Sequence, residues 1–206
     1  MIQLENICKQ YTNHNHTVHA VDNVSFSVAA NERVGIAGGS GSGKSTLLKL
    51  IAMLEKLTSG TLKLFGEDVT SIQNHRDIYR SMQMMFQNPL AIIPPRMNLE
   101  AFLLEPYINY DLMDVASAKD DIRKWMQRVD LPENMVHKYP HEVSGGQLQR
   151  VVLARIMLMN PKLVLFDEPT SALDAVNQKL VLDLLQKLHS EHPFGYVFVS
   201  HDIGLL

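Results

Sequence analysis

The sequence predicts an α/β fold with a largely parallel sheet. Three observations lead to this prediction: short apolar runs alternate with segments of helical periodicity, a glycine-rich phosphate-binding pattern follows one of these runs, and a helical segment interrupts the strands in mid-chain. The 206 residues suffice for one core with an attached subdomain. Hydrophobic residues make up 46 % of the chain and its net charge is −3, so the composition is globular and gives nucleic-acid binding no support.

The N-terminal part of the chain predicts strands around one helix. Apolar residues predict a strand over residues 2–8 and another over residues 18–28, with a polar turn at 11–17 between them. A short apolar strand at 34–37 runs into the glycine-rich loop, and leucines at helical spacing predict a helix over 45–55. This order of strand, loop and helix is the context that a phosphate-binding loop requires.

The middle of the chain changes from strand to helix. Ser59-Gly60 is typical of a turn, and apolar runs at 62–65 and 81–86 predict two more strands. Prolines then break regular structure, and the pattern from 98 to 138 is helical, with Asp114 as an N-cap.

Strand character returns near the C-terminus. Apolar runs at 163–166 and 196–199 predict two strands, and Asp174 between them should cap a helix. The leucines expected to face inward from this helix are Leu180, Leu184, Leu185 and Leu188. We therefore expect a single domain in which residues 1–87 and 159–206 form the core.

An inserted helical subdomain should occupy residues 88–158.

Cys8 is the single cysteine, so no intramolecular disulfide can form, which is typical of a reducing compartment. We expect no signal peptide and no membrane span, since the N-terminus lacks a basic run before an apolar stretch and no apolar run approaches about 18 residues.

A phosphate-binding pattern lies between the strand at 34–37 and the following helix. It fits the P-loop rule of Gly, four residues and Gly-Lys-Ser/Thr. The nucleotide-binding residues expected here are Gly38, Gly39, Ser40, Gly41, Ser42, Gly43, Lys44, Ser45 and Thr46. Glycines let backbone N–H groups form a nest for anionic oxygens, and the helix N-terminus adds its positive end. Lys44 should reach the β- and γ-phosphates and the Ser45 hydroxyl should hold Mg²⁺. Kinases, GTPases and motor ATPases share this loop, so it leaves the function open.

Two acidic residues follow the apolar run at 163–166. A buried strand would deliver Asp167 to its C-terminal end beside the P-loop, where the carboxylate can support Mg²⁺ through water. Glu168 should point toward the place of an attacking water and is the candidate general base. An acidic turn after a strand is common in isolation, and the P-loop is what favours the catalytic interpretation.

A second anion-binding helix start is predicted at Ser144, Gly145, Gly146 and Gln147, which open a helix expected to reach Met159. A hydroxyl, flexible amides and a helix N-terminus bind anions well, although alone the segment would be an ordinary capped helix start. Its sequence resembles the signature motif of ABC-type ATPases. Because the chain already has a phosphate loop, we expect a composite site in which this second surface serves another subunit.

Four further residues match that family in its motif order. Gln87 matches the Q-loop glutamine, which can touch Mg²⁺ and the attacking water, and Asp174 matches the D-loop that crosses the dimer interface, besides being a helix cap. His201 matches the switch histidine, which can donate to the γ-phosphate and orient Glu168. Tyr11 matches the aromatic residue that stacks on adenine; a plain surface tyrosine is the alternative.

The resemblance covers nearly the whole chain. It implies a P-loop NTPase core of the ABC type, an N-terminal antiparallel β subdomain and an inserted α-helical subdomain. It also implies an ATP-binding and ATP-hydrolysing subunit with ATP and Mg²⁺ as cofactors, peripheral at the cytoplasmic face of the cell membrane. Its partners would be integral membrane permease subunits, a second ATPase subunit (identical or different) and, indirectly, a substrate-binding protein, with no nucleic acid.

Subfamily character is expected at the segments 87–91 and 95–97, Gln-Asn-Pro-Leu-Ala and Pro-Arg-Met. These are similar to peptide/nickel-type importers, as are residues 21–26 and 198–202, which implies import of peptides, nickel or metal chelates. Lipoprotein, amino-acid and export systems stay open, because the ATPase does not contact the cargo.

Three alternatives remain at the level of sequence: a soluble ABC ATPase acting on nucleic acid or ribosomes, a P-loop kinase or GTPase, and a non-catalytic cassette. The chain also departs from the family pattern twice. Val143 stands where leucine is usual, and the sequence ends soon after His201, where family domains continue, so we expect a shortened member or an incomplete segment.

Overall fold

The computed structural model describes residues 1–13, 16–88, 92–171 and 173–205. They form two compact units. The first comprises Met1–Met84, Lys162–Glu168 and Phe194–Leu206, and the second comprises Met85–Pro161 and Pro169–Pro193. Residues 169–193, expected with the core, therefore group with the helical unit.

An antiparallel sheet forms part of the first unit. It contains β1 (Ile2–Asn13), β2 (His16–Val28), β4 (Ser59–Leu64) and β5 (Glu67–Asp68), in the order β2-β1-β4-β5. β1 pairs antiparallel with both β2 and β4, and its buried residues include Ile2, Leu4 and Ile7. The N-terminal antiparallel β subdomain is thereby confirmed.

Of two expected turns, the one within 11–17 is narrower than predicted, because the chain reverses between Asn13 and His16, and the one at Ser59-Gly60 is wrong. Residues 11–13 continue β1, and β2 begins at His16, so most of the predicted polar turn at 11–17 is strand. Ser59-Gly60 opens β4 instead of reversing the chain. The backbone of Gly60 has φ 96°, and a Cβ there would lie 2.4 Å from the Asn6 carbonyl oxygen. That glycine allows β4 to approach β1 closely.

A second sheet in the order β3-β8-β7-β6 carries the phosphate-binding loop. Its strands are β3 (Arg33–Ala37), β6 (Met82–Met85), β7 (Leu163–Asp167) and β8 (Gly195–Ser200). β3 and β7 both pair parallel with β8. Every residue of β7 is buried, which explains its unbroken apolar sequence, since both faces of a parallel sheet are covered. The predicted α/β fold with a largely parallel sheet is confirmed.

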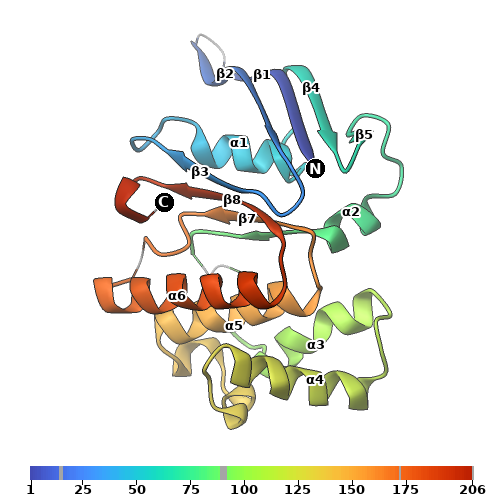
Figure 1. The fold of residues 1–206 in the computed structure, drawn as a ribbon, viewed down its shortest axis with the longest axis vertical. Helices are drawn as coiled ribbons and strands as arrows, with labels where there is room; N and C mark the ends of the chain where they lie inside the picture. Colours follow the sequence, from blue (N-terminus) through green and yellow to red (C-terminus); the bar gives the residue numbers. More distant parts are fainter. Residues whose placement is uncertain (14–15, 89–91, 172, 206) are drawn as a thin grey trace. The chain divides into compact units, whose positions relative to one another are not determined.

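Two helices complete the first unit. α1 (Lys44–Ile51) contacts β2 of one sheet and β7 of the other, and Figure 1 shows it lying between the two sheets. It is shorter than the predicted helix over 45–55, because Met53 has a left-handed backbone with φ 56°. α2 (His75–Ser81), capped by the side chain of Asn74, was not expected.

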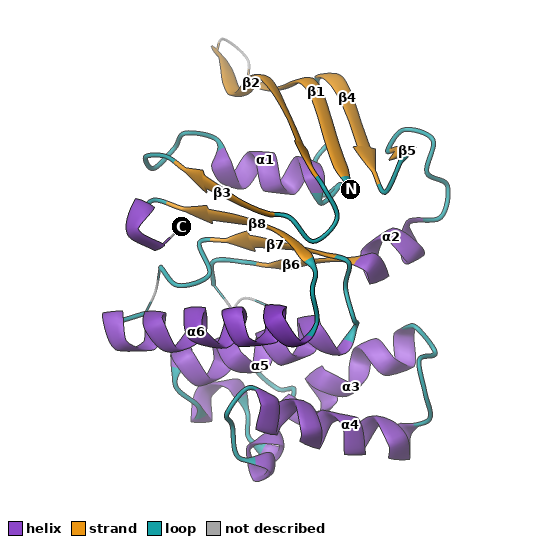
Figure 2. Ribbon diagram, viewed as in Figure 1, coloured by secondary structure: helices purple, strands orange, loops and turns teal. Residues whose placement is uncertain are grey.

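The second unit is helical, as Figure 2 shows. Its α-helices are α3 (Leu99–Asn109), α4 (Val115–Arg128), α5 (Gly145–Leu158) and α6 (Ala175–Glu191), joined in part by short 3-10 helices at Glu133–His137 and Pro140–Glu142. Asp114 caps α4 as predicted, accepting hydrogen bonds from the N–H groups of Ala116 and Ser117. Leu184, Leu185 and Leu188 of α6 are buried as predicted, but Leu180 is half exposed.

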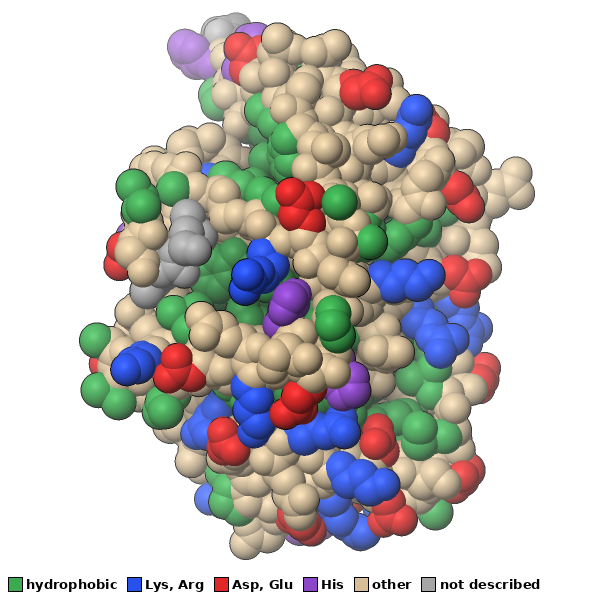
Figure 3. Space-filling view, in the orientation of Figure 1, with side chains coloured by type: hydrophobic (Ala, Val, Ile, Leu, Met, Phe, Trp, Pro, Cys, Tyr) green, Lys and Arg blue, Asp and Glu red, His purple; other side chains and the backbone are tan. Residues whose placement is uncertain are grey.

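None of the helices among the described residues is both long and apolar enough to cross a bilayer. On the face shown in Figure 3, acidic and basic side chains are interspersed.

Candidate functional site

The P-loop connects β3 to α1, and its lysine folds back onto the loop. Lys44 is 8 % exposed, and its Nζ donates to the carbonyl oxygens of Gly38 at 2.7 Å and Gly39 at 2.8 Å. These bonds hold the ammonium group over the loop that sequence analysis assigns to phosphate. A flexible four-carbon stem lets the same group turn to an anionic ligand.

Gly43 joins the loop to the antiparallel sheet. Its backbone has φ 89°, and a Cβ there would lie 1.9 Å from the carbonyl oxygen of Ala20 in β2. Both the left-handed backbone and the close approach require glycine. The carbonyl oxygen of Gly43 accepts the N–H of Leu47 at 2.9 Å, so this residue also begins the hydrogen bonding of α1.

Ser45 and Asp167 meet at the start of α1 and the end of β7. The Ser45 Oγ donates to Asp167 Oδ1 at 2.8 Å. Burial raises the pKa of the Asp167 carboxyl above its ordinary value, the hydrogen bond from Ser45 opposes that shift, and the nearby Glu168 charge adds to it. A hydroxyl and one carboxylate are the few protein oxygens that Mg²⁺ takes beside water and phosphate. The pair therefore fits Mg²⁺, although no cluster of three His, Cys, Asp or Glu suited to a metal occurs among the described residues.

Glu168 lies between a cation and an imidazole. Its Oε1 is 3.9 Å from Lys44 Nζ, and its Oε2 is 3.3 Å from Nδ1 of His201. Its backbone is left-handed, with φ 46°, and its N–H donates to the Val199 carbonyl oxygen at 3.1 Å. A non-glycine residue in that region is uncommon and often marks a functional position. Glu168 therefore has other partners than Asp167, which accepts from Ser45.

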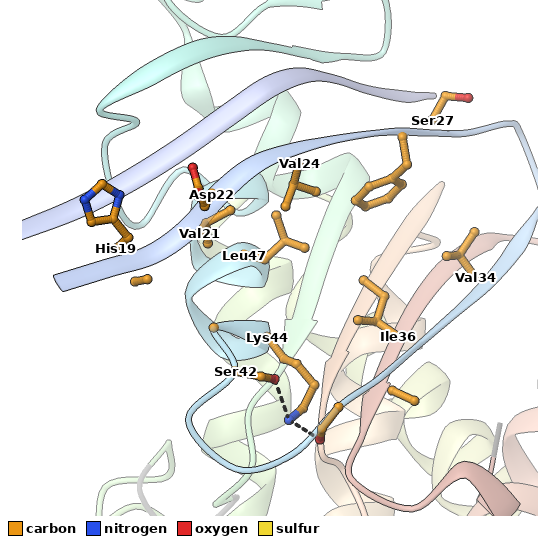
Figure 4. A pocket seen from close by; sticks show the side chains of 15 residues that line it. His19, Val21, Asp22, Val24, Ser27, Val34, Ile36, Ser42, Lys44 and Leu47 are labelled. Atoms are coloured by element: carbon orange, nitrogen blue, oxygen red, sulfur yellow. Dashed lines mark hydrogen bonds between the residues drawn. The ribbon is translucent and has the colours of Figure 1, made fainter.

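A cavity of about 630 Å³ borders the loop inside the first unit. Figure 4 shows Ser42 and Lys44 at one end, and Val24, Leu47, Val34 and Ile36 along its walls. The walls come from β2, β3 and α1 and are mostly apolar, so phosphate-binding groups are confined to the loop end.

Tyr11 is 41 % exposed on β1 and pairs with Val18 of β2. The Nζ of Lys9 lies 4.7 Å from the centre of its ring. An exposed aromatic face beside a lysine suits adenine stacking, and this role stays a prediction.

The predicted signature residues form a capped helix start in the second unit. The Ser144 Oγ accepts the N–H of Gln147 at 3.3 Å, and Gln147 Oε1 accepts the N–H of Ser144 at 2.9 Å, a capping box. Ser144 and Gly145 are exposed within this unit, Gln147 is half-buried and Gly146 is buried. The first turn of α5 is thus pre-formed with part of its surface free for an anion.

Two other predicted site residues, Asp174 and Gln87, lie in the second unit. Asp174 caps α6, and hydrogen bonds from the backbone and then the side chain of Asn177 lower its pKa. Gln87 lies two residues beyond β6, and its contact with Mg²⁺ stays a prediction. Residues 89–91 of the subfamily motif and Ala172 of the D-loop lie outside the described residues, as do 14 and 15.

Sequence reasoning missed two contacts around these motifs. The Ala20 carbonyl oxygen beside Gly43 gave no signal, because any residue supplies a carbonyl. The sequence indicates the Asn177 contact only weakly. Asn177 is the third residue after the N-cap residue Asp174, and from there its side chain can donate a hydrogen bond to the Asp174 carboxylate.

Comparison with known proteins agrees with this arrangement. The sequence profile of the ABC transporter family matches residues 21–171. The chain is 36 % identical to the oligopeptide transport ATP-binding protein AppF of Bacillus subtilis over 92 % of its length and 58 % of that relative. It is 38 % identical to the di/tripeptide transport ATP-binding protein DppF of Pseudomonas aeruginosa over 92 % of its length and 59 % of that relative.

A solved structure is similar over the whole chain. The ATP-binding cassette MJ0796, in a dimeric post-hydrolysis state bound to ADP and Pi, superposes with a TM-score of 0.89 at 30 % identity, covering 100 % of this chain and 90 % of that one. The chain spans somewhat under two thirds of the length of the curated relatives, 58 % for AppF. A P-loop, the acidic pair at the end of β7 and a capped Ser-Gly-Gly-Gln helix start occur together in one chain that matches this family's profile, and the chain belongs to the ABC transporter family.

Proposed function

We propose that this chain is the ATP-binding and ATP-hydrolysing part of an importer, and that it drives a separate membrane permease. The observation that carries the proposal is the position of Glu168, held between Lys44 and His201 beside the Ser45–Asp167 pair. This set supplies a general base, a cation for developing charge and oxygen ligands for Mg²⁺.

Each of these residues has its own role in ATP binding and hydrolysis. Lys44 leaves the carbonyl oxygens of Gly38 and Gly39 and pairs with the β- and γ-phosphates, which the loop amides also bind. Ser45 and Asp167 hold Mg²⁺, which when bound neutralises charge on the phosphates. Glu168 accepts a proton from the attacking water, and His201 orients Glu168 and donates to the γ-phosphate. Gln87 would contact Mg²⁺ and the attacking water, and Tyr11 would stack on adenine.

The second half of the site comes from another subunit. Ser144, Gly145, Gly146 and Gln147, with Asp174, close over the γ-phosphate bound to the partner's P-loop. The exposed, capped start of α5 supports this step, since a helix N-terminus with free amides binds anions. The dimeric state described for MJ0796 supports it as well. Closure excludes water and completes the site.

Peptides are the proposed cargo class. The relatives named above are peptide transport ATP-binding proteins, whereas nickel rests only on the motif similarity at 87–91 and 95–97. The chain would lie at the cytoplasmic face of the membrane, bound to permease subunits and indirectly to a substrate-binding protein. The same relatives disfavour a soluble ATPase acting on nucleic acid or ribosomes.

The experiment is affinity purification of the tagged full chain from detergent-solubilised membranes, followed by identification of what accompanies it. We expect permease subunits and one ATPase partner, with Mg²⁺-dependent ATP hydrolysis in the eluate. Recovery of ribosomes or nucleic acid in place of a permease would contradict the proposal.

A further inference from the structure

Asn177 connects two motifs of the second unit. It lies in the first turn of α6, where its N–H donates to Asp174 Oδ1 at 3.0 Å and its Nδ2 donates to Asp174 Oδ2 at 2.6 Å. Because a carboxylate only accepts hydrogen bonds, these contacts fix the Nδ2 end of the amide toward Asp174. The carbonyl end of the amide is then free to face another element.

That carbonyl end occupies the space that a side chain on Gly146 would need. A Cβ on Gly146 would lie 2.9 Å from Asn177 Oδ1 and 3.3 Å from Asn177 Cγ. Gly146 is buried and helical, so glycine serves close packing here, without an unusual backbone angle. Next to it, a Cβ on Gly145 would be 3.9 Å from Leu173 Cδ2, an ordinary contact. Gly145 thus faces Leu173 of the D-loop match (residues 171–174), and Gly146 faces Asn177 of α6.

The segment that carries Asn177 is itself held in shape. The carbonyl oxygen of Thr170 accepts the N–H of Leu173 and the Nε2 of Gln178, both at 3.1 Å. Thr170 is buried. These hydrogen bonds and the cap of α6 fix Leu173 and Gln178 on either side of the turn that carries Asn177.

We propose that Asn177 is a positioning residue for ATP hydrolysis, whose amide joins the D-loop cap Asp174 to the signature residue Gly146 so that both reach the partner's nucleotide as one block. The proposal rests on the proposed function, because it assumes that both motifs act across a dimer. Without the link, the two motifs would have to be ordered separately during closure, which lowers turnover. Nucleotide binding to the P-loop of the first unit should be unaffected.

The first test is a double-mutant cycle between Gly146→Ala and Asn177→Ala, read as ATP turnover. The alanine methyl group at 146 collides with the Asn177 amide, so Gly146→Ala alone should be poorly active. Removing the amide relieves that collision, and the double variant should regain about fivefold or more over Gly146→Ala. Lys179→Ala, at an exposed position of α6, is the matched control and should give no rescue. If Gly146→Ala lowers ATP turnover by the same factor in the wild-type chain and in the Asn177→Ala variant, the proposal is overturned.

The second test separates the link from mere space filling. Asn177→Leu keeps a side chain branched at Cγ against Gly146 and removes the Nδ2 hydrogen bond to Asp174, while the backbone hydrogen bond remains. We expect kcat to fall about tenfold with the KM for ATP within about twofold and an unchanged midpoint of thermal unfolding. A wild-type kcat in Asn177→Leu would show that the amide only fills space.

Hydrogen exchange distinguishes this inference from the proposed function. In the nucleotide-free chain, the Gln147 and Leu148 amides bond to Ser144 and should exchange faster in Asn177→Leu than in wild type. If Asn177→Leu changes neither the exchange rates nor the ATP turnover, the link through Asn177 is wrong, and the proposed function is not affected. A wild-type chain that hydrolyses no ATP defeats the proposed function, while the exchange rates still decide whether Asn177 orders the start of α5.

Discussion

The hydroxyl of Ser45 donates to the carboxylate of Asp167 at 2.8 Å, across 122 residues of sequence. The bond joins the first turn of α1 to the end of β7, so it holds the P-loop against the acidic end of that strand. Asp167 is 6 % exposed, and burying a carboxylate is costly unless it is paired or bound to a metal. Mg²⁺ held by Asp167 would offset that cost.

Asp167→Asn should test that cost. Burial raises the pKa of Asp167 in the folded protein, so the native state binds its proton more tightly than the unfolded state does. Stability then falls as pH rises from the unfolded value near 3.8 through the folded pKa. The asparagine variant keeps the acceptor for Ser45 and has no charge to bury.

We expect Asp167→Asn to unfold at a higher temperature than wild type at pH 7, and the difference to disappear toward pH 4. Thermal unfolding followed across this pH range measures it. The variant should also lose Mg²⁺-dependent hydrolysis. A variant less stable than wild type at pH 7 would show that burial of the charge is not the main influence on Asp167.

Gly43→Ala should destabilise the fold. A methyl group would lie 1.9 Å from the Ala20 carbonyl oxygen, and the backbone at φ 89° is strained for alanine. We expect a loss of about 2–4 kcal/mol in the free energy of unfolding, measured by urea denaturation. Gly39→Ala is the matched control, because a Cβ there meets nothing within 4 Å. Equal stability of the two variants would contradict the close approach of the loop to β2.

Glu168→Gln should abolish turnover while sparing ATP binding. The amide keeps the shape of the side chain and cannot accept the proton of the attacking water, so we expect hydrolysis to fall about 100-fold or more. Steady-state hydrolysis and equilibrium ATP binding measure the two effects. Glu191→Gln, at the exposed end of α6, is the control. If turnover stays near wild type while ATP binds, the assignment of Glu168 as general base is wrong.

His201→Ala should act through Glu168. The imidazole lies 3.3 Å from the carboxylate, so its loss frees Glu168 and removes a donor to the γ-phosphate; we expect about a 10- to 100-fold fall in kcat. Because the two residues work as a unit, His201→Ala in the Glu168→Gln background should add little further loss. His141→Ala, also exposed, controls for removal of an imidazole. Fully additive losses would mean that the two residues act independently.

The strand β7 could be predicted because every one of its residues is buried, which leaves an uninterrupted apolar run. The hairpin end of β1 and β2, up to Thr17, could not be predicted, since Tyr11, Thr12, His16 and Thr17 are exposed and show no alternation of apolar and polar residues. α2 was missed because only Ile78 of its seven residues is buried, which leaves no helical periodicity to detect.

The site residues were predicted from the spacing of the motifs. That spacing predicts the chemical role of each residue but not which side chains it contacts. Lys44, Glu168 and His201 come from three elements, and their distances depend on the order β3-β8-β7 in the sheet. The packing of Asn177 on Gly146 depends on how two helices meet, and sequence periodicity says nothing of that. Likewise Leu180 fits an inward spacing yet lies half exposed, because the buried face of α6 is narrower than its apolar stripe.

The central claim, that a P-loop and a signature motif from different subunits share one nucleotide, is tested most directly by mixing two inactive variants. Lys44→Ala removes the P-loop cation of one chain, and Ser144→Arg blocks the start of α5 in the other. If the motifs act in trans, each mixed dimer retains one intact composite site, and ATP hydrolysis should return on mixing to about a quarter of the wild-type rate or less. Hydrolysis that stays absent on mixing, from variants shown to form mixed dimers, would contradict the account.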